Sequence, residues 1–374
     1  MTSGQKGKET AMRNITRDVP EFESEAYKEK FFRCLWSGVV PPKFSYSGSA
    51  AYSHAALAAT PGYRAITEAV KLEAGMVLSH LELAGECQIA EVGPGTGYHT
   101  IDIIKTVSTV RNDLQIRYLG LDFSVTLLDI ARPVLENATT LGLKTAEWDV
   151  DEGPTDAIRR WRANGIVHTL MVGNTLANLD DPAVALRNIR ESLAAGDTLL
   201  LSVNLVGDKP DPAEITSPYR TPEFRATVLE PFRAAGVDID TFDILYEDSE
   251  VMAFVTLGAN YYHERDTLPA GQRIRCFRSR RFSQDTFIGY LKESGFSSSA
   301  TYLRRAGDLA VALAVIELFL PCDLTAGVRR ILASQNRKVV ADGKSGCSAR
   351  NSQHLWKCCP DVRHLVSSTC RRSH

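Results

Sequence analysis

Four short apolar runs, separated by segments with helical periodicity, most strongly limit the folds open to this chain. The runs are CQIAEVG (87–93), IRYLGLD (116–122), VHTLMVG (167–173) and TLLLSVN (198–204). Helix candidates between them include 101–110, 125–137 and 182–193, the last with Asp180 or Asp181 available as its cap. This alternation predicts an α/β fold with a doubly wound, mostly parallel sheet.

The composition is that of an ordinary globular chain, but its charge is unevenly distributed. No run approaches the roughly 18–20 apolar residues that a membrane helix needs. Residues 325–374 carry ten Lys and Arg against two Asp and Glu, which leaves residues 1–324 with a net charge of −10. An acidic body binds polyanions poorly. We therefore expect a cytoplasmic, monomeric protein with a small-molecule substrate and with neither a nucleic-acid nor a membrane partner.

The eight cysteines form neither a disulfide framework nor a zinc-ligand pattern, so we expect reduced thiols and no metal. Four of them lie in the basic C-terminal segment with three histidines, and only Cys358 and Cys359 are close in sequence.

After residue 204 the pattern changes. A helix at about 224–235 precedes strands at 243–247, 251–262 and 272–282, and a helix at 283–294 that Gly295 closes. This order predicts an inserted antiparallel unit, after which TYLRRAGDLAVALAVIELFL returns to the first sheet. The expected regions are an N-terminal arm of the substrate domain (1–66), a cofactor-binding Rossmann-like core (67–205), an inserted substrate or lid domain (206–281), a return to the core sheet (282–320) and a basic, disordered tail (321–374).

The turn EVGPGTG (91–97) joins an apolar strand to a helix, and its glycines allow a ligand to approach the backbone closely. Asp122 ends the next strand, where a carboxylate can accept both hydroxyls of a ribose. Asp149 follows where an adenine edge would lie, although a turn residue is an equal interpretation. The alternative is an NAD-dependent oxidoreductase that uses the same glycine turn. Two features argue against it. The G-x-G-x-G spacing departs from the dinucleotide fingerprint, and positive charge is scarce, since Lys105 is the one basic residue between 98 and 106.

This order of Glu-x-Gly-x-Gly, strand-end Asp and a further Asp resembles the S-adenosylmethionine-dependent class I methyltransferases. The resemblance implies a Rossmann-like class I methyltransferase fold with an inserted α+β substrate-binding or lid domain, and S-adenosyl-L-methionine as the cofactor. The cofactor-binding residues that it implies are Glu91, Gly93, Gly95, Gly97, Asp122, Phe123, Asp149 and Val150.

Three further stretches resemble one methyltransferase family. PPKFSYSGS (41–49), TPGYRAITE (60–68) and MVGNTLANLDD (171–181) are similar to PPKWFYD…GS, LPEYYPTRTE and LGSTIGNL of the histidine Nα-methyltransferases of ergothioneine synthesis. That family also includes fungal dimethylallyltryptophan N-methyltransferases, and the match runs over about residues 40–315.

The family resemblance implies roles for four residues. Asn178 would hold the substrate's α-amino group, Tyr46 and Tyr63 would line the site of its amine and carboxylate, and Tyr219 would bind the carboxylate. Asn178, Tyr63 and Tyr46 are thus the predicted catalytic residues. The structural alternatives are a turn cap for Asn178 and half-buried core positions for the tyrosines.

The acceptor is predicted to differ from histidine. CFRSRRF (276–282) resembles the family's TEVSCKF, with Phe277 where the family has an acid that contacts imidazole and with Ser279 retaining the serine. Two basic family residues are replaced by His99 and Ile66. We expect N-methylation of an amino acid or an amino-acid-derived amine, with Phe277 and Ser279 among the substrate-binding residues. The alternative is a non-catalytic relative that retains the cofactor site.

Five arginines crowd the same stretch. On a regular strand Arg273, Arg275 and Arg281 share one face, and Arg278 and Arg280 the other. Two interpretations remain open. One is a guanidinium that binds an anionic substrate, and the other is a solvated strand.

Overall fold

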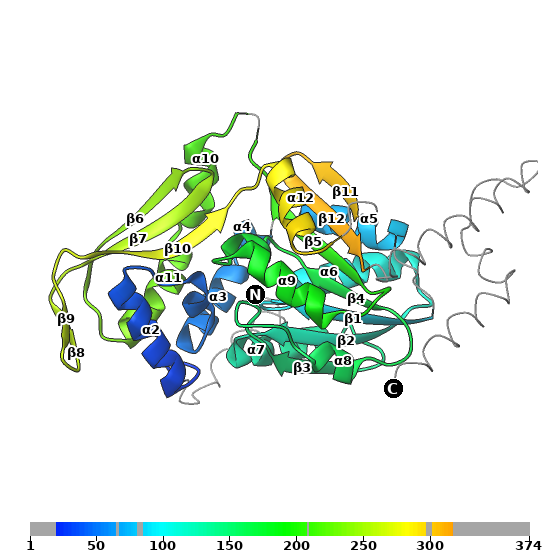
Figure 1. The fold of residues 1–374 in the computed structure, drawn as a ribbon, viewed down its shortest axis with the longest axis horizontal. Helices are drawn as coiled ribbons and strands as arrows, with labels where there is room; N and C mark the ends of the chain where they lie inside the picture. Colours follow the sequence, from blue (N-terminus) through cyan, green and yellow to red (C-terminus); the bar gives the residue numbers. More distant parts are fainter. Residues whose placement is uncertain (1–19, 65–66, 81–84, 208, 297–300, 317–374) are drawn as a thin grey trace, which may run out of the picture. The chain divides into compact units, whose positions relative to one another are not determined.

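The computed structural model describes residues 20–64, 67–80, 85–207, 209–296 and 301–316, and its largest feature is a seven-stranded sheet (Figure 1). In spatial order the strands are β11 (Thr301–Ala306), β12 (Leu309–Val315), β5 (Thr198–Asn204), β4 (Val167–Met171), β1 (Glu86–Val92), β2 (Gln115–Asp122) and β3 (Leu143–Glu147). Strands β1 to β5 are parallel, whereas β12 is antiparallel to both β5 and β11. The predicted fold class is confirmed, and the last apolar run does return to the sheet.

Helices cover both faces of this sheet, because its central strands are apolar on both sides. Strand β1 is buried at every position after Glu86, with Ala90 and Val92 in the hydrophobic core on one face and Cys87 and Ile89 in the core on the other. The first core is shared with α8 (Ala157–Trp161), α9 (Pro182–Ser192) and α12 (Gln284–Glu293), and the second with α5 (Thr67–His80), α6 (Tyr98–Val110) and α7 (Val125–Glu136).

Capping residues fix the helix ends as the sequence predicts. The Asp181 side chain accepts hydrogen bonds from the backbone N–H groups of Ala183 and Val184, both at 3.0 Å, and Pro182 begins α9. Helix α12 ends at Glu293, and Gly295 follows with φ +87°, a left-handed conformation that favours glycine. None of the helices within the described ranges is long and apolar enough to cross a membrane.

A second sheet, antiparallel and in the order β10-β7-β6, forms what we call the accessory unit together with its neighbouring helices (Figure 1). Burial alternates along β7, as expected for a sheet with one covered face. Its apolar core includes residues of the N-terminal arm, here residues 20–64. The elements are α2 (Glu25–Ser37), η1 (Pro42–Tyr46), α3 (Ser49–Ala58), α4 (Pro61–Arg64), α10 (Pro212–Thr216), η3 (Ser217–Tyr219), α11 (Pro222–Ala234), β6 (Ile239–Glu247), β7 (Glu250–Leu257), β8 (Tyr261–His263), β9 (Asp266–Leu268) and β10 (Arg273–Arg280).

Some sequence expectations need correction. Strand β3 was not predicted, and the strand expected at 251–262 ends at Leu257, after which β8 begins a separate hairpin with β9. The expected region boundaries stay predictions, with Ile66 and the whole of 321–374 outside the described residues.

The arginine pattern on β10 also differs from the prediction. A register shift between Arg275 and Phe277 marks a β-bulge, which inserts one extra residue and reverses the alternation beyond it. Arg273, Arg275, Arg278 and Arg280 consequently occupy the less buried positions of the strand together, whereas a regular strand would divide them between two faces.

Candidate active site

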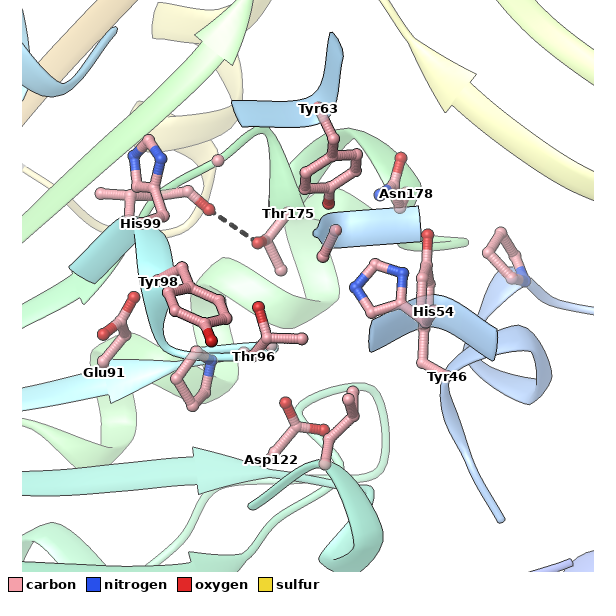
Figure 2. Close-up of a pocket in the computed structure, with 18 of the residues that line it drawn as sticks. Tyr46, His54, Tyr63, Glu91, Thr96, Tyr98, His99, Asp122, Thr175 and Asn178 are labelled. Atoms are coloured by element: carbon pink, nitrogen blue, oxygen red, sulfur yellow. Dashed lines mark hydrogen bonds between the residues drawn. The ribbon is translucent and has the colours of Figure 1, made fainter. Parts of the chain in front are cut away.

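A cavity of about 570 Å³ lies at the carboxyl ends of β1, β2 and β4 (Figure 2). Its volume is within the roughly 300–1,000 Å³ that is usual for small-molecule sites. Strand order reverses between β1 and β4, and doubly wound sheets bind ligands at such a point. The residues singled out from the sequence that line it are Tyr46, Tyr63, Glu91, Gly93, Gly95, Asp122, Phe123 and Asn178.

The glycine turn after β1 needs glycine at three positions. Gly93, Gly95 and Gly97 have φ values of +70°, +55° and +77°. A Cβ on Gly93 would lie 3.0 Å from Thr175 Cγ2, and one on Gly97 would lie 2.9 Å from Leu135 Cγ. Gly97 therefore packs against α7 and does not line the cavity. Helix α6 follows without a side-chain cap, which leaves its first backbone N–H groups available to a ligand.

Glu91 is a buried acid held in place by two hydroxyl groups. Thr100 Oγ1 and the Tyr118 hydroxyl donate hydrogen bonds to Glu91 Oε2 at 2.6 and 2.5 Å. Burial raises the pKa of Glu91 despite these two hydrogen bonds. The carboxyl group is thus fixed at the base of the glycine turn, as part of the cavity wall.

Asp122 is the second buried acid, at 4% exposure. Its Oδ1 accepts the backbone N–H of Ser124 at 3.0 Å. Burial, together with the nearby carboxyl groups of Glu23, Asp149 and Glu91, raises the pKa of Asp122 to about 7. This carboxyl group can still accept hydrogen bonds from a ligand with hydroxyl groups.

The loop after β3 presents a different acid from the one predicted. Asp149 and Val150 do not line the cavity, but Asp151 does. Asp149 Oδ2 accepts a hydrogen bond from Lys43 Nζ at 2.6 Å, and Val150 lies in the core with its carbonyl accepting from Asn188 Nδ2 at 2.8 Å. Burial raises the pKa of Asp151 to about 6.

The N-terminal arm is held to the sheet by Glu23. Glu23 Oε1 accepts hydrogen bonds from Ser124 Oγ at 2.6 Å and from the Gly48 backbone N–H at 3.1 Å, and Glu23 Oε2 accepts from Thr126 Oγ1 at 3.0 Å. These bonds place a carboxylate at the N-terminus of α7, which is favourable for the helix dipole. The arm thereby becomes a fixed wall of the cavity.

Asn178 lies at the end of η2 (Thr175–Asn178), the turn that follows β4. Its amide makes no hydrogen bond to the described part of the chain, and its Oδ1 is buried. Rotation about χ2 can therefore present either end of the amide to a ligand without breaking a protein hydrogen bond.

Two of the predicted tyrosines, Tyr46 and Tyr63, line the arm side of the cavity. Burial raises the pKa of Tyr46 above its ordinary range and that of Tyr63 to about 12. Tyr63 is 41% exposed as a residue, but its hydroxyl end points into the cavity (Figure 2). Tyr219 does not line the cavity and packs edge-on against Phe224, although its charge interaction contributes to both pKa shifts. Tyr46 and Tyr63 are therefore protonated hydrogen-bond donors at neutral pH.

The structure does not bring Phe277 or Ser279 to the cavity. Phe277 is 3% exposed and lies in the core of the accessory unit, with its ring 4.9 Å from that of Phe224 at 90° and 5.6 Å from that of Tyr219. Ser279 Oγ accepts a hydrogen bond from Asn174 Nδ2 at 3.3 Å. Phe277 thus supports the accessory unit, and Ser279 supports the residue that precedes η2; neither forms the cavity surface.

Two histidines in the cavity wall also depart from expectation. His99, which replaces a basic family residue, lies with Nε2 2.5 Å from Oε2 of the fully buried Glu73. Burial lowers the pKa of His99, but the ion pair with Glu73 outweighs it and the net pKa is raised. His54 on α3 lines the cavity and was missed entirely, because a single histidine in an apolar helix carries no motif.

A doubly wound sheet with a cavity beside a glycine turn and two buried carboxyl groups is the arrangement of an α/β enzyme with a small-molecule site. A family model described as S-adenosylmethionine-dependent, histidine-specific methyltransferase matches residues 39–233. The chain belongs to this family, so it is a methyltransferase and its cofactor is S-adenosylmethionine. The predicted family, enzyme class and cofactor are confirmed.

Solved methyltransferase structures show only a distant likeness. A methyltransferase from Clostridium acetobutylicum is 10% identical over 71% of this chain and 98% of its own, with a TM-score of 0.40. The glycopeptide N-methyltransferase MtfA with bound S-adenosylmethionine is 16% identical over 66% and 94%, with a TM-score of 0.36. The amino pentose methyltransferase CalS10 from Micromonospora echinaspora is 13% identical over 67% and 90%, with a TM-score of 0.35. No curated protein matches the sequence significantly.

Proposed function

We propose that this methyltransferase acts on the amine of an amino acid or of a small molecule derived from one, and that the acceptor is not histidine. The observation that carries the proposal is the Asn178 amide, which lines the cavity and makes no hydrogen bond to the described protein. Leaving a buried amide unpartnered costs free energy, and a bound amine would remove that cost. Its carbonyl accepts an N–H without adding positive charge.

The cavity residues suit the cofactor chemically. Asp122 is proposed to accept the ribose hydroxyls, and Glu91, Gly93, Gly95 and Phe123 to complete the nucleoside and methionine wall. The Ser124 N–H is the single hydrogen-bond donor to Asp122 among the described residues, and burial still raises the pKa of Asp122 to about 7, so ribose hydroxyls would supply further stabilising donors. Asp151 replaces Asp149 in our assignment of the adenine side, because Asp149 is already bound by Lys43.

When bound, the cofactor would supply a methyl group carried on a sulfonium sulfur. The acceptor's nitrogen lone pair would form a bond to the methyl carbon while the carbon–sulfur bond breaks and its electron pair stays with sulfur. The protein's contribution is to hold that lone pair in line and to exclude water. Tyr46 and Tyr63 are protonated, so they are proposed to donate hydrogen bonds to the acceptor's carboxylate and not to serve as bases. The proton released by the amine passes to solvent.

Histidine is disfavoured as the acceptor because β10 offers no acid to the cavity. The residue aligned with the family's imidazole-binding acid is Phe277, which lies inside the accessory unit. Aromatic rings of Tyr46 and Tyr63 and the rings of Pro41 and Pro42 line the arm side of the cavity, and they suit an apolar or aromatic side chain.

A mixed amine pool incubated with S-adenosylmethionine and followed by mass spectrometry tests the proposal. We expect a gain of one or more methyl groups on an amino-acid-like amine and none on histidine. Calorimetric titration with S-adenosylhomocysteine, NAD and histidine provides the binding control. Methylation only of hydroxyl or thiol compounds, or binding of S-adenosylhomocysteine without any methyl transfer, would contradict the proposal.

A further inference from the structure

His54 is a buried side chain whose polar atoms the protein does not satisfy. It lies on α3 at 6% exposure, and its Nδ1 has neither solvent contact nor a hydrogen-bond partner among the described residues. His168 is buried as well, but its Nδ1 lies 3.0 Å from Thr198 Oγ1. His168 is therefore an ordinary structural histidine with a satisfied nitrogen, whereas His54 is buried although one of its nitrogens has no partner.

The second nitrogen of His54 faces the glycine turn. Its Nε2 lies 3.9 Å from the position that a Cβ on Gly95 would occupy. The imidazole packs edge-to-face against Tyr46, with ring centroids 4.8 Å apart at 84°, and against Tyr63, 5.9 Å apart at 83°. Figure 2 shows it on the same side of the cavity as these tyrosines and Asn178. The two phenol rings therefore fix the direction in which Nε2 points.

The imidazole is electrically neutral in this setting. Burial lowers the pKa of His54 to about 4, so at physiological pH one ring nitrogen carries a proton and the other a free lone pair. A neutral ring adds no positive charge beside a sulfonium or an amine. It can orient an amine by accepting a hydrogen bond, but its low basicity makes it a poor general base for the amine's proton.

We propose that His54 contacts the methyl acceptor directly, with Nε2 accepting a hydrogen bond from the same amine that the Asn178 carbonyl holds. This inference rests on the proposed function of the cavity. A neutral primary amine has two N–H groups and one lone pair. If the His54 and Asn178 acceptors bind both N–H groups, the lone pair is left free to meet the methyl group. An alcohol has one O–H and cannot bind both acceptors, so the pair selects amines.

Three substitutions separate the two ring nitrogens. His54→Phe keeps a ring of similar shape without nitrogen, His54→Gln keeps a polar atom near the position of Nε2, and His54→Asn keeps one near Nδ1. Tyr52→Phe is the matched control, because Tyr52 is an exposed residue of the same helix that does not line the cavity. Each protein is tested for kcat and KM with the amine that the wild type methylates best, for S-adenosylhomocysteine affinity and for Tm.

We expect His54→Phe to lower kcat/KM about tenfold to hundredfold through loss of one hydrogen bond to the acceptor. Its S-adenosylhomocysteine affinity should stay within about twofold of the wild type, and its Tm should be equal or higher because an unsatisfied buried nitrogen is gone. His54→Gln should recover most of the activity and His54→Asn should not. Should His54→Phe fail to fold, the Gln and Asn variants still decide the question between them.

Full turnover by His54→Phe would overturn the inference. So would rescue by Asn in place of Gln, or a loss of S-adenosylhomocysteine affinity that matches the loss of turnover, since His54 would then contact the cofactor. These results are distinct from a failure of the proposed function. That failure appears in the wild type, as methyl transfer to hydroxyl or thiol compounds only or as no transfer to any member of the pool.

Discussion

Arg280 Nη2 donates a hydrogen bond to the backbone carbonyl of Asp180 at 2.8 Å, and Nη1 of the same guanidinium donates to the carbonyl of Leu179. These carbonyls belong to the two residues that follow Asn178. Arg280 also forms an ion pair with Glu250 at 3.1 Å. The arginine-rich strand β10 thus holds the end of η2, which neither the anion-binding nor the solvated-strand interpretation anticipates.

Arg280→Ala should lower kcat by about tenfold to hundredfold, because the loop that carries Asn178 loses two hydrogen bonds from a charged donor. We expect S-adenosylhomocysteine affinity to change little, since Arg280 does not line the cavity. Arg278→Ala is the control, because Arg278 pairs with the same Glu250 at 2.9 Å without a hydrogen bond to the loop. Equal kcat losses in both variants would show that only the ion pair with Glu250 matters.

Asp122→Asn should have opposite effects on stability and on cofactor affinity. The folded pKa of about 7 lies above the unfolded value of about 3.9, so folding binds a proton and ionisation destabilises the protein as the pH rises from 4 to 7. The side chain of the variant cannot ionise. We therefore expect its free energy of unfolding to exceed that of the wild type by roughly 1–4 kcal/mol at pH 8 and to show no such gain at pH 4.

The same substitution should weaken S-adenosylhomocysteine binding by about 1–3 kcal/mol, through loss of a charged acceptor for two hydroxyls. Denaturant unfolding at the two pH values and calorimetric titration measure the two effects. Asp129→Asn on α7, where the side chain is exposed, is the control for a change of charge alone. Unaltered affinity would remove Asp122 from the cofactor site.

Asn178→Ala should slow turnover without destabilising the fold. The amide makes no hydrogen bond within the described chain, so the loss is expected in the contact with the acceptor, at about 1–3 kcal/mol of transition-state free energy. Asn174→Ala offers a contrast, because Asn174 has φ +66°, donates to Ser279 and accepts from the Asn204 backbone N–H at 2.9 Å. We expect Asn174→Ala, but not Asn178→Ala, to lower the Tm. A comparable Tm loss in Asn178→Ala would indicate the turn-cap role instead.

Phe277→Leu should lower stability and leave the acceptor preference unchanged. Phe277 lies in the core of the accessory unit, so a smaller side chain there should cost roughly 1–2 kcal/mol. The ratio of kcat/KM values for two amines of different size is the relevant measurement, with Tyr46→Phe in the cavity wall as the comparison. A changed ratio of kcat/KM values in Phe277→Leu would show that Phe277 does contribute to the acceptor site.

The parts of the fold that could be predicted from the sequence are those with a strong local signal. The runs that became β1, β2, β4 and β5 are buried at most positions on both faces and are therefore largely apolar, whereas β3 is a short, half-exposed edge strand whose sequence, LKTAE, resembles a loop. The cap at Asp181 and the glycine turn were recognisable because each depends on a few adjacent residues.

The site was harder to predict where it depends on register or on distant segments. The β-bulge in β10 places on one face arginines that a regular strand would divide between two faces, and the sequence CFRSRRF gives no signal of this bulge. The choice between Asp149 and Asp151 is decided by Lys43, which lies more than 100 residues earlier in the sequence. His54 acquires its significance only when α3 packs beside the glycine turn, since the feature that distinguishes it is the lack of a partner.

The N-terminal arm contributes Tyr46, His54 and Tyr63 to the cavity, yet it joins a sheet only through an isolated β-bridge from Val39 to Arg275 of β10. Side-chain changes after this bridge therefore leave the hydrogen-bonded ladders untouched, so the acceptor wall can be altered without altering the sheets. For the same reason, a library aimed at altered amine selectivity should randomise positions within 41–63 before any position in the strands.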